Sequence, residues 1–320
     1  MDPVNPVSLA RPPALKPGDR VAVLCVSSPV EPDALAAGLD ALRFAGLDPV
    51  TYPSVHDAGT MRRYLAGDDA MRAGDLRSAL TEPGIAGILF ARGGSGAQRT
   101  LEAMDWDGLT GLPPAVLPPK VLAGYSDVTA VLEAVAVRLG WASVFGPNIA
   151  IREGGSHYSF GSLLRTLMRP EQATVIEYPR AVTVVPGLAR GVTTGGTLSL
   201  LVSSLGTGTS RPARGGILLL EDVNEEDYRL DRMLTQLRRS GYLDGVAGIV
   251  AGTFTGCGPP EAIQDILAER LGDLQAPMIA WANVGHGGPF QAFPYGIAAE
   301  LDASAATLRL LEPPLEPPLS

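Results

Sequence analysis

The first half of this 320-residue chain alternates strand signals with helix signals, and two of its strand signals end in small-residue turns. The strand signals lie at residues 20–26, 49–52, 85–91 and 120–123. Between the first two, Leu35, Leu39 and Leu42 recur at helical spacing, and Gly46 is a natural helix end. This alternation predicts an α/β fold, in which helices cover both faces of a parallel sheet.

The second half repeats the alternation after an interruption. Residues 169–186 lose periodicity and hold three prolines, so we expect a linker there. It would join an N-terminal α/β domain, residues 1–168, to a C-terminal domain, residues 187–320. The C-terminal domain is expected to be α/β or β-rich, because strand signals at 217–220 and 246–251 enclose a helix signal. Residues 312–320 repeat Glu-Pro-Pro-Leu and predict an extended tail.

The composition excludes several classes of partner. The net charge of -9 argues against nucleic acid, since phosphate binding needs clustered Lys and Arg. No apolar stretch reaches the roughly 18 uncharged residues of a membrane span, and residues 1–19 lack the apolar core of a secretory signal. Two cysteines are too few for a disulfide scaffold or a Cys-based zinc site. We therefore expect a cytoplasmic protein without a nucleic-acid or membrane partner.

A candidate nucleophile, Ser126, follows the strand signal at 120–123 in the sequence Gly-Tyr-Ser-Asp, and a helix signal follows at 128–139. A tight turn between a buried strand and a helix raises a serine above the sheet, as in a nucleophile elbow. The fifth position of the Gly-x-Ser-x-Gly pattern is Val128 here, so the pattern is half met. The alternative is that Ser126 or Asp127 caps the following helix.

A general base and an acid are also available. The chain has three histidines, and His286 lies among glycines that permit close approach to a ligand. His56 lies in a polar segment and His157 in an expected loop, so His286 is the favoured base, although an exposed loop histidine is the alternative. Glu221 directly follows the strand signal at 217–220, and a carboxylate at this strand end can orient an imidazole. The alternatives are that Glu221 is a solvated acid or caps the next helix.

A glycine turn, Gly93-Gly94-Ser95-Gly96, follows the strand signal at 85–91. Its backbone N–H groups could hold a phosphate or the oxyanion of a tetrahedral intermediate. The turn lacks the Lys-Ser/Thr ending of a P-loop and the spacing of a dinucleotide fingerprint, so a nucleotide site is disfavoured. Cys257 has no evident base beside it and is better interpreted as a small structural residue than as a nucleophile.

Taken in order, these segments resemble the LD-carboxypeptidase family of serine peptidases, which includes muramoyltetrapeptide carboxypeptidases and microcin C immunity-type peptidases. The resemblance runs nearly end to end. Its motifs are Ser-Ser-Pro at 27–29, Ala-Arg-Gly-Gly at 91–94, Gly-Tyr-Ser-Asp-Val-Thr at 124–129, Gly-Gly-Thr-Leu-Ser-Leu at 195–200, Leu-Glu-Asp-Val at 220–223, Tyr-Arg-Leu-Asp-Arg-Met-Leu at 228–234, Gly-His at 285–286 and Phe-Pro-Tyr-Gly at 293–296.

The resemblance implies a role for each candidate residue. Ser126 matches the nucleophile, His286 the base and Glu221 the acid that orients it, and the N–H groups of Gly94 and Asp127 match the oxyanion hole. It also implies a homodimer that needs neither metal nor cofactor. The implied reaction is release of the terminal D-Ala from a murein tetrapeptide, in peptidoglycan recycling. Two alternatives stay open: a detoxifying peptidase that cleaves aminoacyl-adenylate or acyl-sulfamoyl conjugates, and a non-catalytic muropeptide-binding protein.

Two positions depart from the family pattern. Ser95 stands where Tyr is common, and Phe290 stands where Asn is frequent. Both are expected near the substrate, so they bear on pocket shape rather than on the catalytic groups. Arg92, which precedes the glycine turn, is a candidate for binding the substrate carboxylate and equally a candidate for a structural ion pair.

Overall fold

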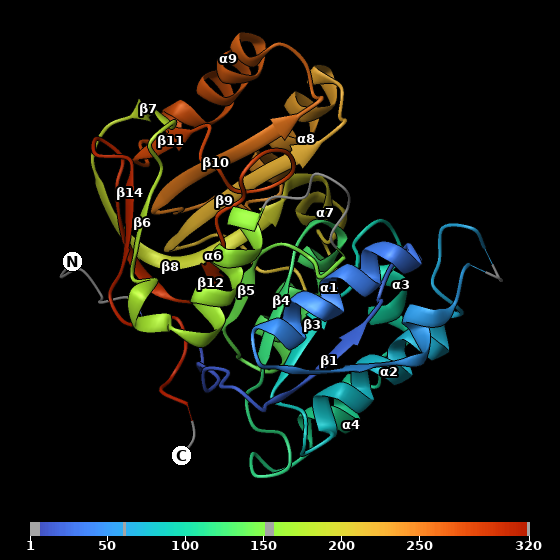
Figure 1. Cartoon of the computed structure of the whole chain (residues 1–320). Coiled ribbons are helices and arrows are strands. Elements are labelled where there is room, and N and C mark those ends of the chain that lie inside the picture. Colours follow the sequence, from blue (N-terminus) through green and yellow to red (C-terminus); the bar gives the residue numbers. More distant parts are fainter. Residues whose placement is uncertain (1–6, 60–61, 151–156, 319–320) are drawn as a thin grey trace.

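The computed structural model describes residues 7–59, 62–150 and 157–318, and it contains two β-sheets flanked by helices (Figure 1). The first sheet has the order β12-β5-β4-β3-β1-β2. Its strands are β1 (Arg20–Leu24), β2 (Asp48–Thr51), β3 (Gly87–Phe90), β4 (Val121–Gly124), β5 (Ser143–Phe145) and β12 (Phe293–Tyr295). Strands β1 to β5 are parallel, and β12 pairs antiparallel with β5.

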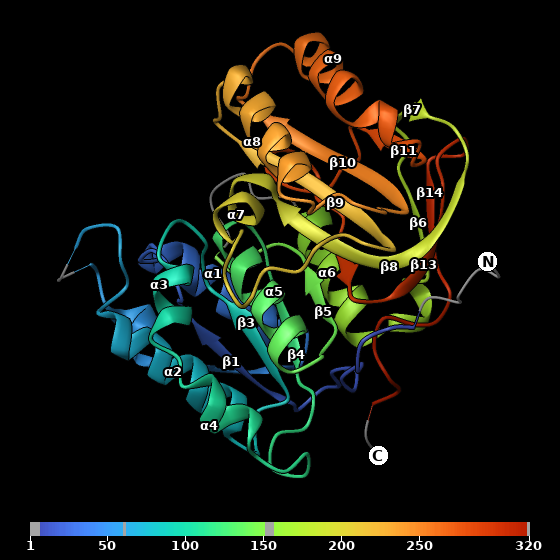
Figure 2. The same cartoon turned by 180° about the vertical axis from the view of Figure 1, so that it is seen from behind.

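Helices cover both faces of the first sheet, as the sequence predicted. They are α1 (Pro32–Phe44), α2 (Asp69–Thr81), α3 (Ala97–Glu102), α4 (Trp106–Thr110), α5 (Thr129–Arg138) and α6 (His157–Met168). Apolar side chains of α1 and α6 pack on one face, and those of α2 to α5 pack on the other. Figure 1 accordingly shows α1 and α6 in front of the sheet. Figure 2 shows the molecule from the opposite side, where α5 lies in front of the sheet. The fold is therefore α/β.

The second sheet has the order β6-β14-β13-β8-β9-β10-β11-β7. Its strands are β6 (Val175–Glu177), β7 (Val182–Val185), β8 (Leu188–Thr197), β9 (Gly216–Val223), β10 (Gly248–Thr255), β11 (Met278–Ala280), β13 (Ala298–Asp302) and β14 (Thr307–Leu310). The four strands β8 to β11 are parallel and the others are antiparallel. One face packs against α7 (Leu198–Ser203), α8 (Asp227–Arg239) and α9 (Pro260–Leu271), and the other against the first half of the chain.

The expected linker at 169–186 is not a bare connection. It holds a 3₁₀ helix, η3 (Pro170–Gln172), and the strands β6 and β7, which lie at opposite edges of the second sheet. Its three prolines fall outside these strands, so they separate short elements rather than prevent them. The second half also contributes β12 to the first sheet, so the two sheets do not divide strictly in chain order.

The described residues also include the 3₁₀ helices η1 (Pro53–His56), η2 (Ser126–Val128) and η4 (Gly272–Leu274). Of the expected tail, residues 312–318 are described, and they contain bends and pack on the molecule, because Glu316 forms a bridge with Pro13 and Leu315 is buried. Within the described ranges, no helix has the length and apolar character needed to cross a bilayer.

Candidate active site

Ser126 lies in a strained turn directly after β4. It is the first residue of η2 and has a φ of 64°, in the left-handed region that L-residues rarely adopt. The backbone of Gly93 passes over its side chain, since a Cβ on Gly93 would lie 2.9 Å from the Cβ of Ser126. Neither Ser126 nor Asp127 caps α5, because its N-cap is Val128, with no side-chain cap. The turn therefore presents the hydroxyl rather than using it to cap the helix.

Glu221 and His286 form a hydrogen-bonded pair. The imidazole Nδ1 lies 2.7 Å from Glu221 Oε2, which also accepts a hydrogen bond of 3.0 Å from the His286 backbone N–H. Glu221 is fully buried near the end of β9, whereas the His286 side chain keeps 16% of its surface exposed. Gly285 must be glycine, because it has a φ of 113° and a Cβ there would overlap the carboxylate. A buried carboxylate thus faces a partly open imidazole.

The loop that carries His286 is held from two other sides. Its backbone carbonyl accepts hydrogen bonds from the hydroxyls of Thr253 (2.6 Å) and Thr255 (2.5 Å), both on β10. On the other side, the Tyr125 ring lies against the imidazole, with 4.8 Å between ring centroids. Tyr125 adjoins Ser126, so this contact brings the imidazole next to the turn that carries Ser126. These contacts fix the imidazole although it lies in a loop.

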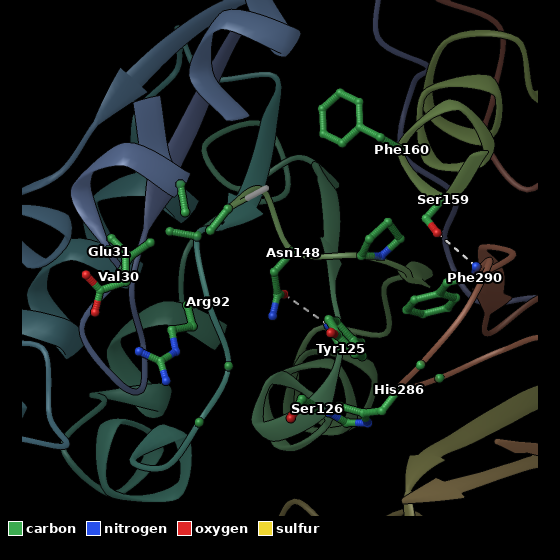
Figure 3. A pocket seen from close by; sticks show the side chains of 18 of the residues that line it. Val30, Glu31, Arg92, Tyr125, Ser126, Asn148, Ser159, Phe160, His286 and Phe290 are labelled. Carbon is green, nitrogen blue, oxygen red and sulfur yellow. Dashed lines mark hydrogen bonds between the residues drawn. The ribbon is translucent and has the colours of Figure 1, made fainter. Parts of the chain in front are cut away.

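Ser126 and His286 line one pocket of about 380 Å³. Figure 3 shows the Ser126 side chain beside the His286 ring. No hydrogen bond joins the two side chains among the described residues. Such bonds are often long before substrate binds and tighten in the complex. The site therefore brings a serine, a histidine and a buried glutamate together from both halves of the chain.

The glycine turn lies beside this pair and is fixed by Ser28. The Ser28 N–H donates to the Gly93 carbonyl (3.2 Å), and the Ser28 hydroxyl accepts from the Ser95 N–H (3.1 Å). Within the described ranges, the N–H groups of Gly94 and Asp127 have no protein acceptor. Unpaired N–H groups beside a candidate nucleophile suit the binding of an oxyanion.

The Asp127 side chain, unlike its backbone N–H, is hydrogen-bonded within the described part of the protein. Its Oδ2 accepts hydrogen bonds from the Ser27 hydroxyl (2.6 Å) and from the N–H of Ala97, the first residue of α3 (2.8 Å). The carboxylate is buried, and burial raises the pKa of Asp127 despite these two donors. Asp127 thereby connects the turn that carries Ser126 to the turns that follow β1 and β3.

Arg92 and an aromatic group form further parts of the pocket wall. Arg92 donates from Nη1 to the Pro29 carbonyl (2.6 Å), and it has no carboxylate partner among the residues described. Phe290 packs edge-on against Tyr125, with ring centroids 5.0 Å apart, and also contacts Phe145. Phe290 therefore lines the same pocket as Ser126 and His286. Ser95 is exposed and does not line this pocket, although its neighbours Gly93 and Gly94 do, and its place near the substrate stays a prediction.

The other sequence candidates lie outside the site. Cys257 is buried, burial raises the pKa of its thiol, and it does not line the pocket. His56 contacts Thr51 on β2, and nothing is described of the His157 side chain. In the part of the chain that the structure describes, no three His, Cys, Asp or Glu side chains gather as a metal site.

Sequence reasoning missed two residues that contact the candidate pair. Tyr125 packs on the imidazole, and Thr197 donates a 2.5 Å hydrogen bond to Glu221 Oε1. Thr197 ends β8 in the sequence Gly-Gly-Thr and pairs with Glu221 on β9, a strand pairing that the sequence alone does not show.

Comparison with known proteins identifies the family. The family model described as the LD-carboxypeptidase N-terminal domain matches residues 21–146, and the model for the C-terminal domain matches residues 190–301. The chain therefore belongs to the LD-carboxypeptidase family, a family of peptidases.

Individual relatives agree with this assignment. A putative carboxypeptidase of Streptomyces coelicolor is 47% identical, covering 96% of this chain and 98% of that protein. The murein tetrapeptide carboxypeptidase of Pseudomonas aeruginosa is 30% identical, over 89% of this chain and 94% of that protein. Among solved structures, MccF in complex with glutamyl sulfamoyl guanosine aligns with a TM-score of 0.83 at 21% identity, covering 97% of this chain and all of that one.

Proposed function

We propose that this protein is a serine LD-carboxypeptidase that releases the terminal D-Ala from a murein tetrapeptide. One observation carries the proposal: the buried Glu221 is hydrogen-bonded to His286 in the pocket where the strained turn presents Ser126. A carboxylate that holds an imidazole beside a serine hydroxyl is the arrangement that activates serine for acyl transfer. The family assignment supports a peptidase reaction for this arrangement.

The proposed reaction has two steps. In the first, Ser126 Oγ bonds to the carbonyl carbon as His286 takes its proton, and the N–H groups of Gly94 and Asp127 hold the oxyanion. The bond to D-Ala then breaks, and the proton passes from His286 to the leaving amine. In the second, a water gives a proton to His286 and attacks the acyl carbon. The ester breaks and Ser126 recovers its proton, while Glu221 stabilises the imidazolium in both steps.

The substrate proposal rests on the relatives and on the charge of the pocket. A relative of 30% identity is named a murein tetrapeptide carboxypeptidase. A carboxypeptidase must bind the free carboxylate of its substrate, and Arg92 is a pocket cation without a carboxylate partner among the described residues. We therefore propose Arg92 as the residue that binds this carboxylate.

The first experiment is mass spectrometry of a murein tetrapeptide incubated with wild type and with Ser126→Ala. We expect the wild type to release D-Ala and to leave the tripeptide, and the variant to lose activity by a factor of about 10⁴ to 10⁶, because the nucleophile is absent. Circular dichroism of the variant checks that it is folded. Equal release by a folded Ser126→Ala would exclude Ser126 as the nucleophile.

A second candidate substrate is an aminoacyl-sulfamoyl or aminoacyl-adenylate conjugate, because the fold aligns with MccF over its whole length. The same assay with such a conjugate separates the candidates. Cleavage of the conjugate alone would favour detoxification. Tight tetrapeptide binding without any turnover by the wild type would instead indicate a muropeptide-binding protein.

The cellular setting is also a proposal. We propose a cytoplasmic homodimer that acts in peptidoglycan recycling. The sequence features described above support the location, and the family resemblance supports the dimer and the recycling role. Light scattering of the purified protein measures its mass in solution directly. A mass of one chain, 33.3 kDa, across the working concentration range would exclude the homodimer.

A further inference from the structure

The second oxygen of the Glu221 carboxylate has its own hydrogen-bond donor. Oε2 is used by the ring and backbone of His286, and Oε1 accepts the hydroxyl hydrogen of Thr197 at 2.5 Å. Glu221 is fully buried and Thr197 is 2% exposed, so water does not replace this donor. A buried carboxylate oxygen without a donor is costly, and the hydrogen bond therefore fixes the rotation of the carboxylate toward His286.

Thr197 is also attached to the helix that follows the nucleophile. Its backbone N–H donates a 3.2 Å hydrogen bond to the hydroxyl of Thr129, the first residue of α5. Thr129 is three residues after Ser126 and is fully buried. A short series of contacts thus runs from the start of α5 through Thr197 to Glu221, and from Glu221 to the imidazole.

We propose that Thr197 is a positioning residue that sets the orientation of Glu221, and through it that of His286, relative to Ser126. The inference rests on the proposed function of the Ser126–His286–Glu221 site. Thr197 does not line the pocket, so it is expected to act through Glu221 rather than on the substrate. Its removal should therefore lower kcat and leave KM nearly unchanged.

Three variants on β8 test this role. Thr197→Val keeps the shape of the side chain and removes the hydroxyl, whereas Thr197→Ser keeps the hydroxyl. Thr194→Val is the matched control, because Thr194 is buried on the same strand but its hydroxyl bonds Tyr295 instead of Glu221. We expect Thr197→Val to lower kcat for D-Ala release by about 10- to 100-fold, the range for a buried hydrogen bond to a charged group. Thr197→Ser and Thr194→Val should stay within about threefold of wild type.

The outcomes separate this proposal from a general loss of stability. Thr197→Val leaves a carboxylate oxygen without its donor and Thr194→Val leaves a phenol hydroxyl without one, so both melting temperatures should fall, the first at least as far as the second. Only Thr197→Val should lose kcat. Equal kcat in these two variants, or a Thr197→Ser variant as slow as Thr197→Val, would overturn the proposal. A selective rise in KM would also overturn it, since that would indicate contact with the substrate.

A second readout keeps the test independent of the substrate. The rate at which a fluorophosphonate probe labels Ser126 reports activation of the hydroxyl without any peptide. If the wild type labels but releases no D-Ala, the substrate proposal fails while Thr197 is still tested by the labelling rate of each variant. A Thr197→Val variant that labels as fast as wild type would overturn the positioning role.

A double-variant comparison tests the assigned route. If Thr197 acts only through Glu221, its hydroxyl has nothing to position once the carboxylate is removed. The double variant Thr197→Val with Glu221→Ala should then label within about threefold of Glu221→Ala alone. Two losses that multiply would show that Thr197 acts by another route and would overturn the proposal.

Discussion

At the scale of the residue, Ser126 is where strain and the proposed chemistry coincide. A left-handed backbone costs an L-residue about 1–2 kcal/mol, whereas glycine adopts it readily but loses more entropy on folding. We therefore expect Ser126→Gly to be more stable than Ser126→Ala by about 0.5–1 kcal/mol, although both lack the hydroxyl. Urea unfolding of the two variants measures the difference. A glycine variant that is no more stable would argue against strain in the turn.

Some of the candidate residues could be predicted from the sequence and others could not. Ser126 and Glu221 follow apolar strand signals, and His286 is one of three histidines, so strand ends and scarcity singled them out. The structure brings these three together, and their catalytic roles stay a prediction. Tyr125 and Thr197 gave no comparable signal, because a ring contact or a hydroxyl bond depends on which strands become neighbours.

At the scale of the element, the side chain of Asp127 fixes the nucleophile turn against α3. Its carboxylate holds the N–H of Ala97 at the start of α3 and the hydroxyl of Ser27 after β1. Asp127→Ala would leave both donors buried without an acceptor, while the backbone N–H proposed for the oxyanion hole remains. We expect kcat to fall by about 10- to 100-fold and the melting temperature to drop.

Ser27→Ala should have a smaller effect than Asp127→Ala, because it removes only the hydroxyl that donates to Asp127 and the Ala97 N–H keeps its acceptor. Its kcat should lie between those of wild type and Asp127→Ala. The comparison uses D-Ala release at saturating tetrapeptide together with thermal unfolding. An Asp127→Ala protein with wild-type kcat would show that this carboxylate does not position the oxyanion turn.

The sequence did not predict strands β6, β7 and β12, and all of them are short. Long apolar runs such as 217–220 identify central strands, because both faces of these strands are buried. Strands β6 and β7 have three and four residues and lie at sheet edges, where partly exposed side chains and nearby prolines hide the pattern. Strand β12 is equally short, and its pairing with β5 is a long-range contact that no local pattern encodes.

At the scale of the whole molecule, a buried polar cluster joins α5 to the second half of the chain. Glu133 on α5 is fully buried, and its Oε1 accepts hydrogen bonds from the Arg211 N–H (3.1 Å) and the Tyr242 hydroxyl (3.3 Å). Its Oε2 has no partner among the described residues. Burial therefore raises the pKa of Glu133 to about 7, from 4.5, against the opposite effect of these donors.

This shift makes the stability of the protein depend on pH. Between pH 4.5 and 7 the folded state keeps a proton on Glu133 that the unfolded chain releases, so raising the pH through this window destabilises the fold. Above pH 7 the carboxylate is charged in both states, and the full cost is on the order of 3 kcal/mol. Glu133→Gln is neutral at every pH, and its amide oxygen still accepts from Arg211 and Tyr242.

We therefore expect Glu133→Gln to match wild type at pH 4.5 and to become progressively more stable than wild type as the pH rises to 8. Urea unfolding of both proteins at several pH values measures the difference, and Glu102→Gln on α3 is the control because that carboxylate is exposed. A gap that is constant with pH would mean that the pKa of Glu133 is the same in the folded and the unfolded protein. The folded carboxylate would then be charged at neutral pH, with Arg211 as a candidate partner, because the charge of Arg211 lowers this pKa.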